Sequence, residues 1–185
     1  MISLEWVKDY IDISDQDLEE LAVKITQSGI NVEKVITNHI NNLVIGEVLE
    51  CVAHPDSDHL HVCKVNVGNT TEQIVCGAPN VREGLKVIVA LPGAFLPGDF
   101  EIKKSKIRGV ESNGMLCALY ELGLEEKNDE TYAKGIEELG ADAPVGEDPL
   151  KYLGLDDTLY ELDIHKHRNN DCYYHIGFAY EIVLS

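Results

Sequence analysis

The stretch LVIGEVLECVAHPDSDHLHVCKVNVG, residues 43–68, begins a region of short β-rich runs that are separated by turn residues. Further runs follow at intervals of roughly 10–15 residues, and no long helical pattern lies between them. They read QIVCG, LKVIVALPG and FEIKKSKIRG. Prolines and glycines between the runs supply the corners, because these residues favour turns. The region therefore predicts a small antiparallel barrel or sandwich.

The residues before this region predict two helices followed by a strand. Apolar residues have helical spacing within residues 3–12, and Ser14 is the expected N-cap of a second helix with acids in its first turn. Gly29 is expected to end that helix, since glycine readily adopts the left-handed conformation found there. Residues 30–36, INVEKVI, then predict a strand.

The residues after this region carry weaker patterns. Residues 116–124 predict a short helical turn, and the acidic stretch 125–150, with several Gly and Pro, is expected to be loop and boundary. The run LYELDI predicts a strand, followed by a helix capped near Asp171. Because that helix is still apolar at the last residue, we expect a fragment of a longer polypeptide.

Charge is distributed unevenly along the 185 residues. The chain has 15 Lys and Arg against 33 Asp and Glu, a formal net charge of −18. A field of this sign argues against indiscriminate binding to nucleic acid, because it repels phosphate. The net charge is −7 for residues 1–50 and −10 for residues 125–163, but only −1 for residues 51–124. This middle segment contains four cations within six positions, which are Lys103, Lys104, Lys106 and Arg108.

These four cations form a basic stripe with two readings. On a strand, Lys104, Lys106 and Arg108 would share one face in a row of roughly 13 Å, which can follow phosphates. Alternatively, the lysines protect an exposed edge strand from pairing with another chain. Composition alone leaves both open. Since aromatic residues are scarce nearby, we expect any RNA to be held by its backbone and shape rather than by base stacking.

Two clusters of potential metal ligands are interpreted as loops. The first is HPDSDHLHVC, whose ligand types suit zinc, but it offers no distant second pair of ligands and is typical of a turn. Its residues are His54, Asp56, Asp58, His59, His61 and Cys63. The second, HKHRNNDCYYH at residues 165–175, is irregular in spacing. We therefore expect no metal site.

No catalytic motif is present either. The sequence has no nucleophile elbow, no phosphate-binding loop and no paired carboxylates in a distinctive frame. Five widely spaced cysteines predict reduced, buried thiols and a cytosolic protein. No apolar run is long enough for a membrane helix, and the amino terminus does not resemble a leader, so we expect an unprocessed chain with no membrane partner.

Three segments closely resemble the tRNA-binding OB-fold domain of bacterial phenylalanyl-tRNA synthetase β subunits, methionyl-tRNA synthetase extensions and free-standing tRNA-binding proteins. They are HPDSDHLHVCKVNVG, QIVCGAPNVREGLKVIVALPGAFLPG and IKKSKIRGVESNGMLCALYELGL. The flanks, SLEWVKDYIDI…LAVKITQSGINVEKV and LYELDI…DCYYHIGFAYEI, resemble the β subunit on either side of that domain.

The resemblance implies an α+β fold in which a five-stranded OB-fold β-barrel, residues 40–150, is inserted into a small α+β domain. That domain would be built from both chain ends, as a helix-helix-strand part in residues 1–39 and a second part in residues 151–185. The chain would stop before the editing domain of the β subunit.

The resemblance also implies a tRNA-binding, non-catalytic module of a cytoplasmic enzyme. In that family the β subunit pairs with a catalytic α subunit as α2β2 and attaches phenylalanine to tRNA using ATP and Mg²⁺; we expect no cofactor in this region itself. Two alternatives stay open: a module that braces the synthetase without appreciable tRNA affinity, and a free-standing tRNA-binding protein.

The resemblance also implies site residues, each assigned to the matching position of this sequence. The cations are expected to contact phosphates, and Asn80 and Ser112 are expected to form hydrogen bonds or to shape turns. The expected RNA-binding residues are Asn80, Arg82, Lys103, Lys104, Lys106, Arg108 and Ser112. Gly114 and Met115 are expected to be structural. The family's turn motif, H-P-D/N-x-D-x-L, matches at His54 to Leu60, whereas residues 165–171 lack the proline of the family's T-P-N-R-x-D pattern and are one residue longer.

Overall fold

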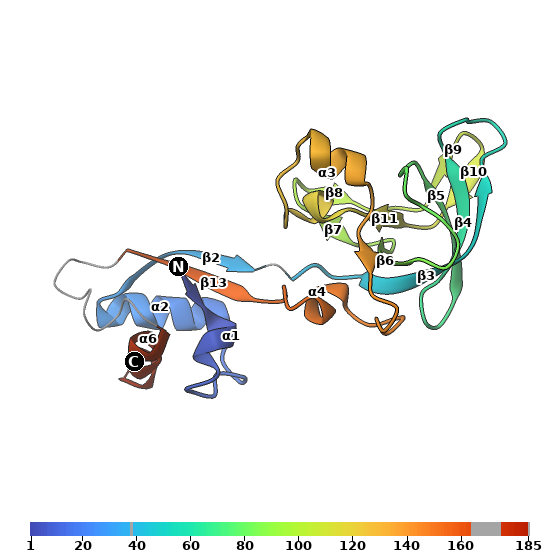
Figure 1. Cartoon of the computed structure of the whole chain (residues 1–185). Coiled ribbons are helices and arrows are strands. Elements are labelled where there is room, and N and C mark those ends of the chain that lie inside the picture. The colour runs from blue at the N-terminus through green and yellow to red at the C-terminus, as the bar shows by residue number, and fades with distance from the viewer. Residues whose placement is uncertain (38, 164–174, 185) are drawn as a thin grey trace. The chain divides into compact units, whose positions relative to one another are not determined.

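The structure is a computed structural model that describes residues 1–37, 39–163 and 175–184. The chain divides into two units, Met1–His39 with Gly154–Ser185, and Ile40–Leu153. Figure 1 shows the elements of each unit. Within the described residues, no helix combines the length and apolarity needed to cross a membrane.

The first unit is a three-stranded antiparallel sheet covered by helices. The strand order is β1 (Ile2–Ser3), β13 (Thr158–Asp163) and β2 (Asn31–Thr37). The helices are α1 (Leu4–Val7), α2 (Leu18–Ser28) and α6 (His175–Leu184). In Figure 1, α2 and α6 lie on the same side of the sheet.

The core of this unit is built around two aromatic rings. Tyr160 and Phe178 are fully buried and pack edge to face, with their centroids 6.2 Å apart. The Tyr160 hydroxyl donates a hydrogen bond to the Leu18 carbonyl, so its polar end is satisfied inside the core, as buried tyrosines require.

The helix α2 begins later than predicted. Its N-cap is Asp17, whose carboxylate accepts from the backbone N–H groups of Glu19 and Glu20 at 2.9 and 3.0 Å. The predicted cap, Ser14, instead donates both its N–H and its hydroxyl to Asp12. The predicted end is confirmed, because Gly29 closes the helix with φ 111°.

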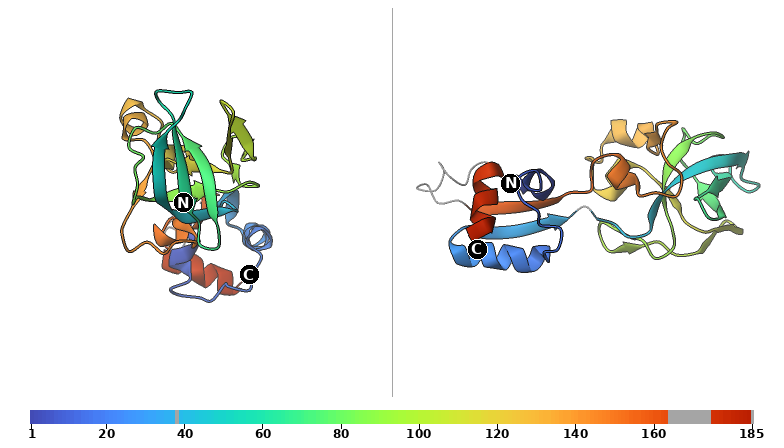
Figure 2. Two further views of the ribbon diagram at one scale, coloured as in Figure 1. Left: turned by 90° about the vertical axis from the view of Figure 1, so that its right-hand side faces the viewer. Right: turned by 90° about the horizontal axis from the view of Figure 1, so that it is seen from below.

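The second unit contains the predicted β-rich region, and its main sheet is antiparallel. The strand order is β11 (Met115–Cys117), β6 (Lys86–Ala90), β3 (Leu43–Ala53), β4 (His61–Asn66) and β5 (Thr71–Cys76), and β12 (Glu138–Leu139) also pairs with β6. Figure 2 shows that this sheet is curled rather than flat. The curl encloses an apolar core.

The strand β3 is shared between two parts of this sheet. Its first half, Leu43–Glu47, pairs with β6, and its second half, from Glu47 onward, pairs with β4. The register shifts between Val48 and Glu50, and such bulges bend a strand and increase its twist. Gly46 lies at the crossing, where an added Cβ would come within 2.7 Å of the side chains of Val89 and Val65.

Cysteine thiols form part of this core. Cys63, Cys76 and Cys117 are buried and free, and Cys51 is half-buried and free. Burial raises the pKa of Cys76 to about 11, and it also raises the pKa of Cys63 and Cys117. The prediction of buried thiols is confirmed for Cys63, Cys76 and Cys117, whereas Cys51 is only half-buried and Cys172 lies outside the described residues.

Residues 125–150 contain more regular structure than predicted. They include α3 (Asp129–Lys134), β12, and the start of α4 (Pro149–Tyr152). Both helices depend on local caps: the Asn128 side chain accepts from the N–H groups of Glu130 and Thr131, and the Asp148 carboxylate accepts from Leu150 N–H. The predicted helical turn is confirmed as η1 (Leu119–Leu122).

Gly114 directly precedes β11, and we expect its replacement to be costly. Its φ is +147°, and a Cβ would lie 2.7 Å from the Ala90 carbonyl oxygen. Gly114→Ala should therefore lower the free energy of unfolding by about 2–4 kcal/mol. Gly84→Ala is the matched control, because Gly84 also has positive φ but an open environment, and should cost about 1 kcal/mol. Urea unfolding measures both, and equal losses would contradict this account.

Candidate nucleic-acid interface

The basic stripe lies on and next to a short β-hairpin. Its strands are β9 (Ser105–Ile107) and β10 (Val110–Ser112), which are paired antiparallel. Arg108 and Gly109 form the two-residue turn, with φ values of 47° and 85°. Positive φ at both positions matches the right-handed twist of the flanking strands, but it is unusual for a non-glycine residue such as Arg108.

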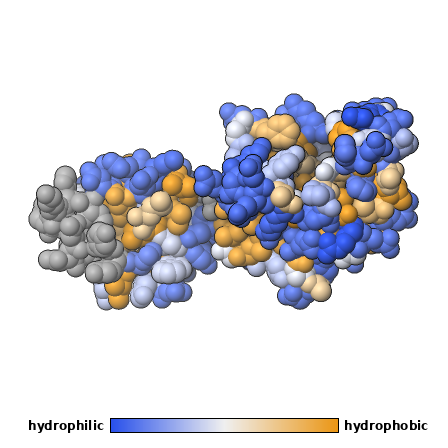
Figure 3. All heavy atoms as spheres, turned by 45° about the horizontal axis from the view of Figure 1, so that its top comes forward, coloured by the Kyte–Doolittle hydropathy of each residue, from blue (hydrophilic) through white to orange (hydrophobic). Residues whose placement is uncertain are grey.

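The four cations are exposed, but they do not form the predicted row on one strand. Only Lys106 lies within β9, whereas Lys103 and Lys104 precede it and Arg108 lies in the turn. The prediction of a long strand was wrong because the tight turn at Arg108 and Gly109 ends β9 after three residues. On the face drawn in Figure 3, hydrophilic residues predominate at the upper right, where Figure 1 places β9 and β10.

Two of these cations are paired with neighbouring carboxylates. Lys103 lies 2.7 Å from Glu101, and Lys106 lies 3.6 Å from Glu111, its cross-strand partner. Exposed pairs of this kind contribute about 0–1 kcal/mol and are screened by salt. Lys104 has no ion-pair partner among the described residues. The lysines can therefore exchange their present partners for phosphate at little cost.

Two hydrogen bonds attach this hairpin to the turn that follows β3. His54 is 4% exposed, and its Nε2 lies 3.1 Å from the Ile107 carbonyl oxygen, while its Nδ1 accepts from Asp56 N–H at 3.0 Å. Arg108 Nη1 donates to the Asp56 carbonyl oxygen at 2.9 Å. A neutral His54 that carries its proton on Nε2 satisfies both contacts. His54, which belongs to the first cluster of potential metal ligands, thus forms hydrogen bonds with backbone groups through both ring nitrogens.

The other members of the two histidine clusters are dispersed. Asp58 and His59 are exposed, and His61 Nδ1 is buried without a hydrogen-bond partner among the described residues. Of the second cluster, only His175 lies within the described residues, and its Nε2 accepts from Ser3 N–H at 3.1 Å.

Ser112 is buried in the sheet and is not available as an RNA contact. It is 1% exposed, accepts from Val75 N–H at 3.0 Å and donates to the Gly114 carbonyl at 3.0 Å. Gln73 joins the same strands, because its side-chain amide donates to the Glu111 carbonyl oxygen and its backbone carbonyl accepts from Asn113 N–H, both at 2.8 Å. No sequence pattern indicated Gln73, since its role depends on a segment 38 residues away.

Asn80 and Arg82 form a separate cluster around Glu138. Asn80 exchanges hydrogen bonds with the backbone of Ile136 at 2.8 and 3.0 Å, and Arg82 binds both oxygens of Glu138 at 2.9 Å. Hydrogen bonds from Arg82, and then from Asn80, lower the pKa of Glu138. Among the described residues, no hydrogen bond or ion pair joins this cluster to the basic stripe. Asn80 therefore shapes a loop, and Arg82 is paired with Glu138.

Comparison with known proteins supplies the family. The chain matches the family described as "Putative tRNA binding domain" over residues 43–148. The chain belongs to this tRNA-binding domain family. The match covers the curled sheet, the basic stripe and the cluster around Glu138 within one domain.

Related proteins extend the similarity beyond the tRNA-binding domain. The chain is 47% identical over 187 residues to the phenylalanine–tRNA ligase beta subunit of Geobacillus kaustophilus, which covers 99% of this chain and 23% of the relative. It is 49% identical over 187 residues to the same subunit of Bdellovibrio bacteriovorus, which covers 98% of this chain and 22% of the relative. The chain thus spans about a quarter of the length of these relatives.

A solved structure is also similar to part of the chain. The C-terminal domain of Plasmodium vivax p43 has a TM-score of 0.40 and 26% identity, and the match covers 57% of each chain.

We expect Ser112→Ala to destabilise the tRNA-binding domain. The change leaves the buried Val75 N–H without an acceptor, which costs about 1–3 kcal/mol. Ser105→Ala is the control, because Ser105 is exposed on the cross-strand partner position. Urea unfolding should separate the two variants, and a Ser112→Ala protein as stable as Ser105→Ala would refute the role of this hydroxyl.

We expect His54→Ala to loosen the basic hairpin. Removing the ring breaks the bonds to Ile107 and Asp56, so amide hydrogen exchange in β9 and β10 should accelerate by about tenfold, which corresponds to about 1.4 kcal/mol of lost protection. His59→Ala, an exposed change in the same turn, should leave this exchange unchanged. Unaltered protection in His54→Ala would show that the hairpin holds its position without the histidine.

Proposed function

We propose that this chain is the N-terminal region of a phenylalanyl-tRNA synthetase β subunit and that its second unit binds tRNA. The observation that carries the proposal is the family match over residues 43–148, joined to 47% identity with such a subunit over nearly the whole chain. The basic stripe would contact phosphates, while aminoacylation with ATP and Mg²⁺ would occur on a catalytic α subunit of a cytoplasmic α2β2 enzyme.

We further propose that the curled sheet closes as a five-stranded OB barrel formed by β3, β4, β5, β11 and β6. Three hydrogen bonds support this closure. They join residues 111–113, which precede β11, to Gln73 and Val75 of β5. The first unit takes residues from both chain ends, which supports insertion of the barrel into an α+β domain.

The electrostatics of the stripe support a phosphate contact of moderate strength. Lys103, Lys104, Lys106 and Arg108 are exposed, whereas Glu101 and Glu111 partly neutralise them. Phosphate carries its charge on several oxygens and can replace a carboxylate on an exposed lysine. The remaining acidic surface would repel RNA, so binding would be confined to the stripe.

A bracing module remains the second candidate. The net charge of −18 and the two carboxylates within the stripe favour it. This candidate predicts no measurable tRNA affinity for the chain, so a titration with tRNA separates it from the proposed function.

The decisive experiment neutralises two lysines of the stripe. Lys104→Gln with Lys106→Gln should weaken tRNA binding by about tenfold at about 50 mM salt, and should lower the slope of log K against log salt by about 1–2. These changes follow from the loss of one or two phosphate contacts. Fluorescence anisotropy with labelled tRNA at about 50 and about 200 mM salt measures both quantities.

The matched control is Lys8→Gln with Lys24→Gln. Both lysines are exposed and paired with a carboxylate in the first unit, so the control changes net charge by the same amount. If the two double variants weaken binding equally, the stripe has no special role; if the unaltered chain fails to bind tRNA, the bracing module is the better description.

A further inference from the structure

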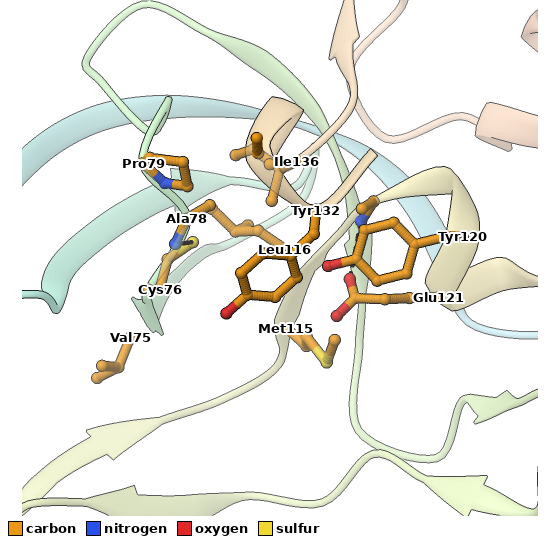
Figure 4. A pocket seen from close by; sticks show the side chains of 14 residues that line it. Val75, Cys76, Ala78, Pro79, Met115, Leu116, Tyr120, Glu121, Tyr132 and Ile136 are labelled. Atoms are coloured by element: carbon orange, nitrogen blue, oxygen red, sulfur yellow. Dashed lines mark hydrogen bonds between the residues drawn. The ribbon is translucent and has the colours of Figure 1, made fainter. Parts of the chain in front are cut away.

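The second unit contains an apolar pocket that the tRNA-binding proposal does not use. Its volume is about 610 Å³, within the range of sites that hold small ligands or side chains. Its walls come from the end of β5, from β11, and from the segment containing η1 and α3. Figure 4 shows Tyr120, Glu121, Tyr132 and Met115 around this space.

Two tyrosine rings and one carboxylate supply the specific chemistry of the pocket. Tyr132 is 66% exposed on α3, and Tyr120 is half-buried. Glu121 is half-buried, and its Oε2 accepts from Ala118 N–H at 2.8 Å, whereas its Oε1 accepts no hydrogen bond from a described residue. Burial raises the pKa of Glu121, so a donor or a cation in the pocket would stabilise this carboxylate.

One tyrosine already holds a cation. The Lys127 ammonium lies 5.6 Å from the centroid of the Tyr120 ring, within the distance at which the negative face of an aromatic ring attracts positive charge. Tyr132 offers a second ring, and its exposure leaves it accessible. The thioether of Met115 adds a soft, polarizable wall.

The charge around the pocket distinguishes a basic ligand from a nucleobase. Residues 119–138 contain seven acidic residues against two lysines. Glu125, Glu126, Asp129 and Glu130 are exposed among them. A base of RNA would bring its phosphates near these carboxylates and be repelled, whereas a cationic side chain would be attracted.

We infer that this pocket binds an arginine side chain of a partner protein. The guanidinium is planar, so it can stack on a tyrosine ring while donating to Glu121 Oε1, and its apolar stem suits the aliphatic walls. Arginine is also the cation that is enriched at protein interfaces. The pocket thus receives a basic segment of a partner protein.

Titration of the 185-residue chain with matched peptides tests this inference. The probes are acetyl-Gly-Arg-Gly-amide, the same peptide with citrulline, which is neutral and of equal shape, and adenosine monophosphate. NMR of labelled tyrosine rings reports occupancy. The arginine peptide should bind at least about fivefold more tightly than the citrulline peptide, since only arginine carries the charge. Adenosine monophosphate should bind more weakly than either peptide.

Variants assign the preference to the pocket. Glu121→Gln should reduce the preference for arginine to less than about twofold, whereas Glu130→Gln, which removes an equal charge from an exposed position outside the pocket lining, should preserve it. Tyr132→Ala, an exposed change that spares the core, should weaken the arginine peptide even if Glu121→Gln unfolds the domain. Equal binding of both peptides, tighter binding of the nucleotide, or no saturable shift would each overturn the inference.

Discussion

The second unit depends on β3 pairing with two partners along its length. The first half of this eleven-residue strand pairs with β6 along one edge, and its second half pairs with β4 along the other edge. The bulge between Val48 and Glu50 supplies the bend, and the absence of a side chain at Gly46 lets Val65 and Val89 approach from two strands. The curl of the sheet, and hence the enclosed core, follows from this arrangement.

The same bend gives the basic hairpin a fixed support. The second half of β3 leads directly into the turn that begins at His54. The His54 ring bonds to the Ile107 carbonyl of β9, and the Asp56 carbonyl accepts a hydrogen bond from Arg108. A two-stranded hairpin of three-residue strands is not stable by itself in water. Attachment to a buried histidine holds the backbone that carries these cations, which lowers the entropy cost that any phosphate contact would have to overcome.

The sequence predicted features with strong local signals and missed those with weak local signals or with distant partners. The β-rich region, the end of α2 at Gly29 and the buried thiols follow from local composition and turn chemistry. The small helices after residue 125 were missed, because single caps at Asn128 and Asp148 are weak signals in an acidic, Gly-containing stretch. Asn80 and Ser112 were expected as hydrogen-bonding or turn-shaping groups of the RNA-binding site. Their side chains do form hydrogen bonds, but with backbone groups 56 and 37 residues away, which no sequence pattern indicated.

The uneven charge of the second unit gives two of its segments opposite preferences for charged ligands. Four cations lie within residues 103–108, whereas residues 119–138 contain seven acids and two lysines. A polyanion is favoured at the first segment and repelled at the second, and a basic side chain has the opposite preference. Complementary charge chiefly improves the rate and selectivity of association. Under the two proposals, the domain would hold RNA at the first segment and a basic protein segment at the second, because each segment would repel the ligand of the other.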